Sequence, residues 1–535
     1  METATYNTKK YKMKPQIIKL IPVISLLSFI TLLSCSKDND DPVSIQTTIS
    51  AYDFSQVIDE GIPAGYEIGT LQASTNQGSL SFSLTNQNPE GALSIDAATG
   101  KLKVANPSLF DYESHPVISG SALVTNEAIS ENINITITLN DINEDNVYIG
   151  TINLRSQTEV DAFGANNYTH ISETLNIGKY LDNQISDIDD LSPLSSLTSI
   201  GRNLIVGLNP NLQNLQGLDN VSQIRGQIVI VQNESLTTIQ SLSKASGLFL
   251  SVSIFENDNL QNLDGLEKLE KLIDLNIVDN ASLKNINGLS NVNRTNAIYV
   301  SNNPQLTTLT GLQNLLKADG GITISDNSAL VNIDDLSNLI ILGDHLSIVE
   351  NSSLSNINGI ENVMMWPENI SIRNNISLQS ISGLTRINNA KSISILENPA
   401  LYSLEGLENL TTASKISIND NESLQNLNQL NNLKSVGELK LDGNENLNNL
   451  DGLSNLESVI QNIRIKNNNA ITNLNGLQNL ILIGENLYIE NNSLLTNFCS
   501  LQQMLLRNGL AGNYNVSNNA YNPTKQDIID GNCSL

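Results

Sequence analysis

Apolar and polar residues alternate in two different rhythms along the 535-residue chain. Over residues 45–146, apolar side chains recur at every second position in short runs, as in residues 133–139, which read Ile-Asn-Ile-Thr-Ile-Thr-Leu. Clusters of turn-forming residues, such as 97–100, separate these runs. A period of two is typical of strands that bury one face. We therefore predict a β-sandwich over residues 45–146.

A longer rhythm begins near residue 175, where L-x-I-x-x-N-x-x-L-x-x-L-x-G-L-x-x-L recurs. Successive asparagines of this motif are 23 or 24 residues apart: Asn209, Asn233, Asn257, Asn280, Asn303, Asn327, Asn351, Asn375, Asn398, Asn421, Asn444, Asn468 and Asn492. A fixed period of this length is the signature of a solenoid, whose coils stack about 4.8 Å apart through parallel strands. The predicted fold class is mostly β: the sandwich, then a parallel β-solenoid of about 13–14 coils over residues 175–498, with terminal caps.

The position of each residue in the motif predicts its role. The outer two residues of L-x-I point inward and the middle one outward, because side chains alternate along a strand. The repeated asparagine is expected to stack into a ladder of amide hydrogen bonds. The later glycine, as at Gly217 and Gly288, is expected to adopt a positive φ.

The open ends of a solenoid need covers. Residues 147–174 are predicted to form an N-terminal cap, in which Ser156-Gln157-Thr158-Glu159 is a capping box that starts a helix. Residues 499–535 are predicted to form a C-terminal cap, with a helix over 500–508 that Gly509 ends. Cys499 and Cys533 are expected to form a disulfide in an oxidising compartment.

The N-terminus has the pattern of a signal peptide over residues 1–35. A lysine-rich stretch precedes an apolar run, 20–33, which is short for a membrane-spanning helix. The run ends in Leu32-Leu33-Ser34-Cys35, which resembles a bacterial lipobox and implies that Cys35 carries the lipid. The acidic tether that follows, 36–44, is similar to the export signals of Bacteroidetes surface lipoproteins. That similarity implies an outer-membrane protein that faces outward and touches the membrane through its lipid alone; a plain flexible linker is the alternative.

Residues 45–146 also resemble a cadherin repeat. The matching motifs occur in family order: Val57-Ile58-Asp59-Glu60, Ile68-Gly69-Thr70-Leu71, Leu93-Ser94-Ile95-Asp96, Asp111-Tyr112-Glu113 and Asp141-Ile142-Asn143-Glu144-Asp145. Carried over residue by residue, the resemblance implies that Ca²⁺ is a cofactor held by Glu60, Asp111, Glu113, Asp141 and Asn143. Carboxylate and amide oxygens are the ligands that Ca²⁺ prefers. The alternative is a solvated acidic edge.

The repeat region resembles leucine-rich repeats, and more closely the receptor L-domain. The units that carry this likeness pair a hydrophobe-glycine step with a short strand and an asparagine, as in Leu342-Gly343, Leu346-Ser347-Ile348 and Asn351. The resemblance covers more than half of the chain. It implies a fold and not a ligand, because such scaffolds bind many partners.

The net charge of −27 argues against nucleic-acid binding, since an acidic surface repels phosphate. The chain has three histidines and no phosphate-binding loop or nucleophile elbow. Polysaccharide lyases also use β-solenoids, but they need a cluster of acidic and basic residues, and the adjacent-coil bases here are Lys440 and Arg464, with Lys466 beside them. We therefore predict that the protein is not an enzyme.

The middle residue of each strand motif gives the candidate binding surface. Read coil by coil, we expect one outward row, called the strand-face row from here on: Tyr299, Thr323, Ser347, Ser371, Ser394, Ser417, Lys440, Arg464 and Tyr488. Flat parallel faces suit extended partners, and the tyrosines suit stacking. The sequence thus predicts a cell-surface binding or adhesion lipoprotein for a protein or glycan partner. The alternatives are an envelope scaffold without a soluble ligand and, third, a polysaccharide-degrading enzyme.

Overall fold

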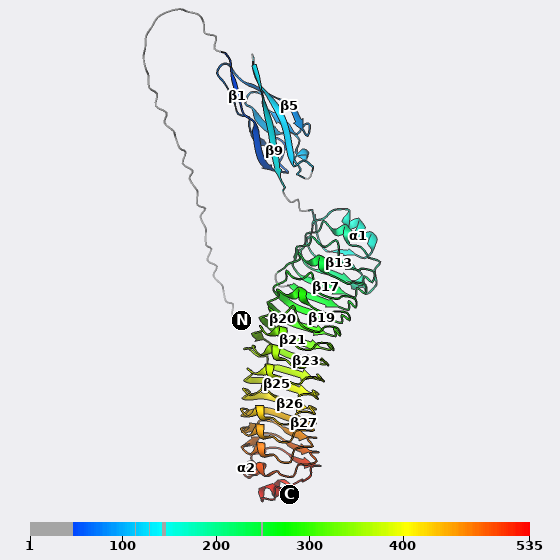
Figure 1. Ribbon diagram of the computed structural model, residues 1–535, viewed down its shortest axis with the longest axis vertical. Coiled ribbons are helices and arrows are strands. Elements are labelled where there is room, and N and C mark those ends of the chain that lie inside the picture. Colours follow the sequence, from blue (N-terminus) through cyan, green and yellow to red (C-terminus); the bar gives the residue numbers. More distant parts are fainter. Residues whose placement is uncertain (1–45, 113, 128, 142–145, 248–249) are drawn as a thin grey trace, which may run out of the picture. The chain divides into compact units, whose positions relative to one another are not determined.

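The computed structural model describes residues 46–112, 114–127, 129–141, 146–247 and 250–535. The chain divides into two compact units, Met1–Asn143 and Glu144–Leu535, and each is considered by itself (Figure 1). Strands dominate both units, so the predicted mostly-β class is confirmed.

The first unit is a sandwich of short strands. Its elements are β1 Ile49–Ala51, β2 Phe54–Asp59, β3 Glu67–Thr70, β4 Ala73–Thr75, β5 Ser81–Asn88, β6 Leu93–Ile95, β7 Lys101–Val104, η1 Pro107–Leu109, β8 Val117–Asn126 and β9 Ile129–Asn140. One sheet has the order β2-β9-β8-β5, another has the order β3-β7-β6, and β1 pairs with β4. The pairing of β2 with β9 is parallel.

The core of the first unit follows from the period-two pattern. Every second residue of β9 from Ile133 to Leu139 is buried, while the residues between them are exposed. These side chains pack with buried residues of the second sheet, such as Leu93 and Leu102, in one apolar cluster. The sandwich predicted from alternation is therefore present.

The second unit is a stack of coils in which successive strands pair with one another (Figure 1). Its long sheet runs in sequence order from β11 to β32, with all of these pairings parallel: β11 Ile152–Leu154, β13 Leu175–Gly178, β15 Leu204–Gly207, β17 Gln227–Val231, β18 Leu250–Phe255, β19 Leu272–Val278, β20 Arg294–Ser301, β21 Lys317–Ser325, β22 Ile341–Leu342, β23 His345–Val349, β24 Asn369–Arg373, β25 Asn389–Leu396, β26 Thr412–Asn419, β27 Ser435–Asp442, β28 Ser458–Val459, β29 Ile463–Lys466, β30 Leu482–Ile483, β31 Leu487–Glu490 and β32 Tyr514–Ser517. The predicted parallel solenoid is confirmed.

Smaller elements complete the coils. A second parallel sheet joins β10 Val147–Tyr148, β12 His170–Ile171, β14 Ser199–Ile200 and β16 Gln223–Ile224. Single 3₁₀ turns occupy the far side of many coils: η2 Tyr180–Asp182, η3 Ser192–Leu194, η4 Gln240–Leu242, η5 Asn287–Leu289, η6 Asp334–Leu336, η7 Asn358–Ile360, η8 Ser382–Leu384, η9 Asn428–Leu430, η10 Asp451–Leu453, η11 Asn475–Leu477 and η12 Cys499–Leu501. Aliphatic side chains from both sides of each coil fill one continuous interior.

The repeated asparagines form the predicted ladder, and Asn351 shows its geometry. The Asn351 side chain is fully buried and donates to the carbonyls of Ile324 (2.9 Å) and Val349 (3.0 Å). Its backbone N–H donates to Asn375 Oδ1 at 3.0 Å, and its own Oδ1 accepts from the N–H of Asn327 at 3.2 Å. Each rung therefore satisfies buried backbone groups of its own coil and of its neighbour.

The ladder has two distinct ends. At its start, the Ser186 hydroxyl donates to Asn209 Oδ1 at 2.5 Å. At its end, the backbone N–H of Asn519 donates to Asn522 Oδ1 at 2.9 Å. The residue before each rung is left-handed, and in many coils it is Asp, Glu or Asn, as at Glu350 (φ 58°). The left-handed residue turns the chain out of the strand.

The repeated glycines serve two purposes, so the prediction of a positive φ at all of them is wrong. Gly217, Gly265, Gly311 and Gly406 do have positive φ values, between 109° and 124°. Others, such as Gly452, are required by close stacking: a Cβ there would lie 1.7 Å from the carbonyl oxygen of Leu427 in the preceding coil. A side chain at that position would overlap the backbone below it.

The N-terminal cap contains more regular structure than predicted. Helix α1, Gln157–Gly164, begins where expected, with the Ser156 side chain accepting the Glu159 N–H at 3.4 Å. Glu159 Oε2, however, accepts from the N–H of Arg155 at 2.6 Å, so the reciprocal half of the capping box is displaced by one residue. Since β11 already pairs with β13, residues 147–174 form a coil of the solenoid as well as its cover.

The C-terminal cap also extends the sheet, because β32 pairs in parallel with β31. The predicted helix over 500–508 is present as η12 followed by α2, Gln502–Leu506, and a further helix, α3, spans Lys525–Ile529. The left-handed residue that ends α2 is Asn508 (φ 55°), and not Gly509 as predicted. Gly509 is instead needed for close approach, since a Cβ would lie 2.1 Å from the Ile481 carbonyl oxygen.

Candidate functional site

The solenoid brings all nine predicted residues of the strand-face row into register. Each one pairs directly with the next across adjacent strands, from Tyr299 opposite Thr323 through to Arg464 opposite Tyr488. The alternation of strand side chains places the row outside the core, as expected. The row is therefore one continuous surface feature and not a set of scattered residues.

The row is less exposed than its outward position suggests. Tyr299 is 39% exposed, whereas Ser417 is only 5% exposed and counts as buried. The expectation that Ser417 is open to a ligand is therefore wrong. The physical reason is its short side chain, which lies between the longer side chains of Lys415 and Asn419 on the same face of β26.

The N-terminal end of the row holds an aromatic pair that sequence reasoning missed. The ring of His345 lies 6.4 Å from the ring of Tyr299, and its Nε2 lies 3.0 Å from the Thr323 hydroxyl. His345 stands two residues before Ser347 on the same strand, so it shares the outward face. Counting two positions back from the row was the signal that could have identified it.

The C-terminal end of the row is a network of paired charges. Arg464 Cζ lies 4.6 Å from the centroid of the Tyr488 ring, and Arg464 also faces Glu438 at 3.8 Å. Lys466 pairs with Glu490 at 2.5 Å. The guanidinium thus covers one face of Tyr488, which we expected to be open for stacking.

Several carboxylates lie beside this network, at the ends of β25, β26 and β27. Burial raises the pKa of the Asp420 carboxyl, and the nearby carboxylates of Asp442, Glu397 and Glu422 raise it further, while Lys440 opposes them. The negative charge of ionised Asp420 is therefore unfavourable in its surroundings.

One predicted calcium ligand, Glu60, contacts the backbone next to two others, Asp111 and Asp141. Glu60 is 3% exposed, and its Oε2 accepts the N–H of Tyr112, next to Asp111, at 2.6 Å. The Glu60 N–H donates to the carbonyl of Asn140, next to Asp141, at 3.3 Å. The other two predicted ligands, Glu113 and Asn143, lie outside the described residues.

Within the part of the chain that the structure describes, no group of three or more His, Cys, Asp or Glu residues is arranged to hold a metal ion. Glu60, Asp111 and Asp141, which all lie in that part, therefore do not form such a group by themselves. The predicted lipid attachment residue, Cys35, also lies outside the described residues. No helix in the described ranges is both long and apolar enough to cross a bilayer.

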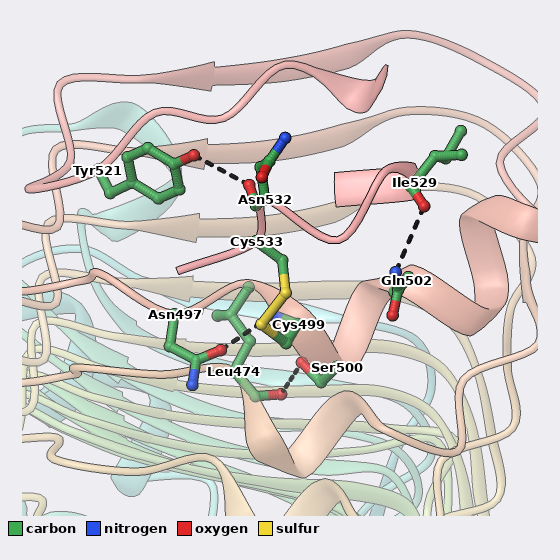
Figure 2. The surroundings of a disulfide bond; sticks show 9 residues. All are labelled: Leu474, Asn497, Cys499, Ser500, Gln502, Tyr521, Ile529, Asn532 and Cys533. Carbon is green, nitrogen blue, oxygen red and sulfur yellow. Dashed lines mark hydrogen bonds between the residues drawn. A yellow bond between two sulfur atoms is a disulfide. The ribbon is translucent and has the colours of Figure 1, made fainter. Parts of the chain in front are cut away.

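The predicted disulfide between Cys499 and Cys533 is present and fastens the C-terminal cap (Figure 2). The backbone around it is held by further hydrogen bonds, from the Cys499 N–H to Asn497 Oδ1 (2.9 Å) and from the Ser500 hydroxyl to the Leu474 carbonyl (2.6 Å). Gln502 reaches across to the Ile529 carbonyl at 3.3 Å. The cystine thus joins η12 to the last residues of the chain.

No family model matches the chain, and no curated protein matches it. Solved structures that resemble part of it include cadherin extracellular domains. Mouse cadherin-23 EC22-24 has 17% identity and a TM-score of 0.17, over 20% of this chain and 38% of that one. The protocadherin gammaB7 EC3-6 cis-dimer has 12% identity and a TM-score of 0.16, over 20% of this chain and 30% of that one. The protocadherin gammaB4 extracellular domain has 17% identity and a TM-score of 0.17, over 20% of each chain. This chain spans well under half the length of these structures.

Proposed function

We propose that the protein is a non-enzymatic surface lipoprotein that uses its solenoid to bind or adhere to a protein or glycan partner. The observation that carries the proposal is the strand-face row, in which Thr323, Ser347, Ser371 and Ser394 stand directly opposite one another on successive coils. Such a row repeats one small hydroxyl at every strand spacing. An extended ligand with a regular repeat is the partner that this periodic surface suits.

The ends of the row supply its specificity in this proposal. Tyr299 and His345 offer exposed aromatic area beside Thr323, and Tyr488 offers a ring already backed by Arg464. Aromatic side chains with a polar tip contribute much of the energy of binding surfaces. Recognition is therefore assigned to the two ends and alignment to the hydroxyls between them.

The test is a binding screen of the full chain against surface glycans and surface proteins. For any partner found, Tyr299→Ala should weaken affinity about tenfold or more, as expected for the loss of an aromatic anchor. Tyr402→Ala is the matched control, because Tyr402 is similarly exposed but lies in a loop outside the row. Binding that is unchanged in a Tyr299→Ala/Tyr488→Ala double variant would disprove the assignment of this face.

An envelope scaffold without a soluble ligand is the second candidate. It is favoured by the charge network at the C-terminal end, where Arg464 and Lys466 are already paired with the chain's own carboxylates. A screen without any partner, together with altered envelope integrity in cells that lack the protein, would favour the scaffold. Turnover of a polysaccharide by the pure protein would instead favour the third alternative, an enzyme.

The anchor belongs to the same proposal. Attachment through a lipid on Cys35 would hold the protein at the outer membrane, facing outward, with the cadherin-like unit as a spacer and the receptor-L-domain-like solenoid as the recognition element. Labelling cells with a fatty acid that reports lipid attachment should mark the wild type and not Cys35→Ala. Surface proteolysis of intact cells distinguishes the outward from the periplasmic orientation.

Calcium binding is proposed for the acidic end of the cadherin-like unit. Glu60 contacts the backbone next to Asp111 and Asp141, and this placement supports the proposal because Ca²⁺ takes carboxylate oxygens. Glu113 and Asn143 would complete the donor set. Bound Ca²⁺ would supply a fixed positive charge that ties the three segments together.

Titration calorimetry with Ca²⁺ tests this proposal. Glu60→Gln should abolish the heat of binding, whereas Glu131→Gln should not, because Glu131 is an exposed carboxylate near the opposite end of β9. A wild-type chain that shows neither heat nor a shift in unfolding temperature on adding Ca²⁺ would remove calcium from the proposal.

A further inference from the structure

A groove of about 880 Å³ is cut into one corner of the solenoid, where the chain enters β25, β26 and β27. These strands lie toward the C-terminal half of the stack in Figure 1. We call this feature the corner groove. Its two ends and its floor are formed by Trp366, Ile460, Ala390, Ala413, Ser414 and Gly437.

The groove exists because three successive coils are one residue shorter at this corner than the coils on either side. Each coil has a small or apolar residue at this corner, such as Ala413, followed by the first inward residue of the strand, such as Ile416. In the short coils, two residues lie between these two positions. Three residues fill the same interval in the flanking coils, as in Val459 to Ile463. The short corners recede and the longer ones stand out as end walls. The same deletion explains the three successive 23-residue intervals between Asn375 and Asn444.

One end wall carries Trp366, which is the single tryptophan of the chain. It is half-buried against the core of the solenoid and stands next to the small residue Ala390. Its indole N–H is shielded from water and has no hydrogen-bond partner within the described residues. Buried indole N–H groups usually find an acceptor. The wall therefore presents an aromatic surface, and the donor behind it becomes available to an acceptor only if the ring moves.

The polar side chains of the lining carry no net charge. The two charged residues, Glu368 and Lys391, face each other at 3.4 Å and cancel. The other polar side chains carry hydroxyl or amide groups, including Thr412, Ser435 and Gln461. Such groups recognise hydroxyl-bearing ligands and give no net attraction to an ionic one.

An extended peptide does not suit this place. Peptides commonly add to a sheet through an unpaired strand edge. Here β25, β26 and β27 are each hydrogen-bonded to a neighbouring strand on both sides. The groove therefore offers side chains to a ligand and no free backbone ladder.

We propose that the corner groove binds a short stretch of a neutral, extended polysaccharide, which lies along the stacking direction of the coils. The groove crosses four coil spacings between the Trp366 and Ile460 walls, about 19 Å at the usual spacing of strands. The site is separate from the strand-face row. The proposal for the corner groove does not depend on the proposal for that row, although both agree with a binding function.

Because Trp366 is the sole tryptophan, its fluorescence reports on this wall alone. Titration of the full chain with neutral glucose, xylose and mannose oligosaccharides should change the intensity and wavelength of that emission in a saturable way for at least one of them. The same titration with neutral peptides of similar length should not. Saturable binding of peptides but of no oligosaccharide would overturn the proposal.

Variants then locate the binding by calorimetry. Trp366→Leu, which installs the residue found at the equivalent place in the preceding coil (Leu342), should weaken affinity about tenfold while keeping the corner filled. Inserting one asparagine between Ser414 and Lys415 restores the longer corner in the middle of the groove and should abolish binding. The matched control inserts asparagine between Asn296 and Ala297, in another short corner that is outside the groove.

Folding of each variant is checked by its unfolding midpoint. Should the insertion at 414 fail to fold, Ser414→Leu adds bulk at the same exposed position and should still weaken binding several-fold, whereas Ser337→Leu should not. Affinity that survives Trp366→Leu and the groove-filling variants overturns the proposal. If Tyr299→Ala and Tyr488→Ala abolish binding of the same oligosaccharide instead, the strand-face row is its site and the corner groove is not.

Discussion

At the scale of single residues, the asparagine ladder decides where the chain leaves each strand. An asparagine amide offers a donor and an acceptor on one short side chain, so one residue type serves the coil above and the coil below. Asn375, for example, donates to the carbonyls of Ile348 and Arg373 and accepts from Asn351. Losing one rung leaves several buried polar groups without partners at once.

Asn351→Ala should therefore lower the stability of the solenoid by about 3 kcal/mol, because buried carbonyls lose their donor and Asn327 loses its acceptor. The measurement is chemical denaturation followed by circular dichroism. Asn338→Ala is the matched control: its amide also donates to a backbone carbonyl of the preceding coil, that of Gln313, but at an exposed position. A loss no greater in Asn351→Ala than in this control would contradict the role of the ladder.

Asp420 is a single residue whose ionisation destabilises the folded state. Its pKa is raised above its ordinary value near 3.8 by burial and by neighbouring carboxylates, so the folded state holds the proton more tightly than the unfolded state. Ionised Asp420 therefore destabilises the fold at neutral pH, and this destabilisation disappears as the pH falls below the unfolded-state pKa.

Asp420→Asn should consequently raise the unfolding midpoint at neutral pH, and the gain should shrink as the pH falls toward about 3.8. Asparagine also suits the left-handed backbone of residue 420 (φ 55°), and that part of the gain does not depend on pH. Denaturation at several pH values separates the two contributions. A gain that stays constant across the series would exclude the electrostatic part.

At the scale of the element, the tight turns on the far side of each coil limit which residues can stack. Gly452 in η10 lies so close to the preceding coil that a Cβ would lie 1.7 Å from the Leu427 carbonyl oxygen. Ser241 occupies the equivalent place in η4 and carries a side chain there. The coils therefore differ in spacing at this turn although their sequences look alike.

Gly452→Ala should destabilise the solenoid by about 3 kcal/mol, since backbone must move to make room for the added methyl group. Ser241→Ala should change stability by less than about 0.5 kcal/mol, because that coil already holds a Cβ. Thermal unfolding of the two variants side by side is the measurement. Equal effects would mean that the turns relax more easily than their geometry indicates.

The sequence was most informative about elements that repeat. Thirteen asparagines in phase predicted the strands, their register and the strand-face row, because one residue fixes the position of every other residue in its coil. Ser417 and His345 were not foreseen correctly, since exposure depends on the size of side chains in neighbouring columns and not on alternation. Gly452 was assigned a positive φ because sequence spacing does not distinguish a left-handed turn from close stacking.

The corner groove marks the limit of what periodicity can tell. The 23-residue intervals were visible in the sequence, but an interval does not say which part of the coil has lost a residue. Only the strand register places the deletion in the first half of β25, β26 and β27. For the acidic residues of the first unit, the resemblance led to Glu60, whose carboxylate and N–H contact the backbone beside Asp111 and Asp141, and the calcium site itself stays a prediction.

At the scale of the whole solenoid, each coil touches its two neighbours, so the last coils are held from one side. The C-terminal end compensates with α2, α3 and the cystine that joins Cys499 to Cys533 across 34 residues of sequence (Figure 2). Buried Phe498 lies next to this link and donates its N–H to the Cys533 carbonyl at 2.8 Å.

Cys533→Ser should lower the stability of the terminal coils by about 3–4 kcal/mol, as expected for opening a loop of this length. Hydrogen exchange should show faster exchange around β31 and β32 and little change near β20. Adding a reductant to the wild type should reproduce the effect, and adding it to Cys533→Ser should do nothing more. Unchanged protection of β32 would mean that the helices alone hold the cap.

The asparagine ladder, finally, has a polarity. Each asparagine from Asn209 to Asn492 donates its backbone N–H to the side-chain oxygen of the next asparagine. The first rung therefore has no earlier rung to donate to its side-chain oxygen, and the last has no later rung to accept its N–H; Ser186 and Asn522 fill these two places. Removing a whole number of coils from the middle of the solenoid leaves both Ser186 and Asn522 in place. Removing coils from either end instead leaves one asparagine of the ladder without its hydrogen-bond partner. Natural length variants of such a protein should therefore differ by internal coils and keep a hydroxyl at one tip and an amide at the other.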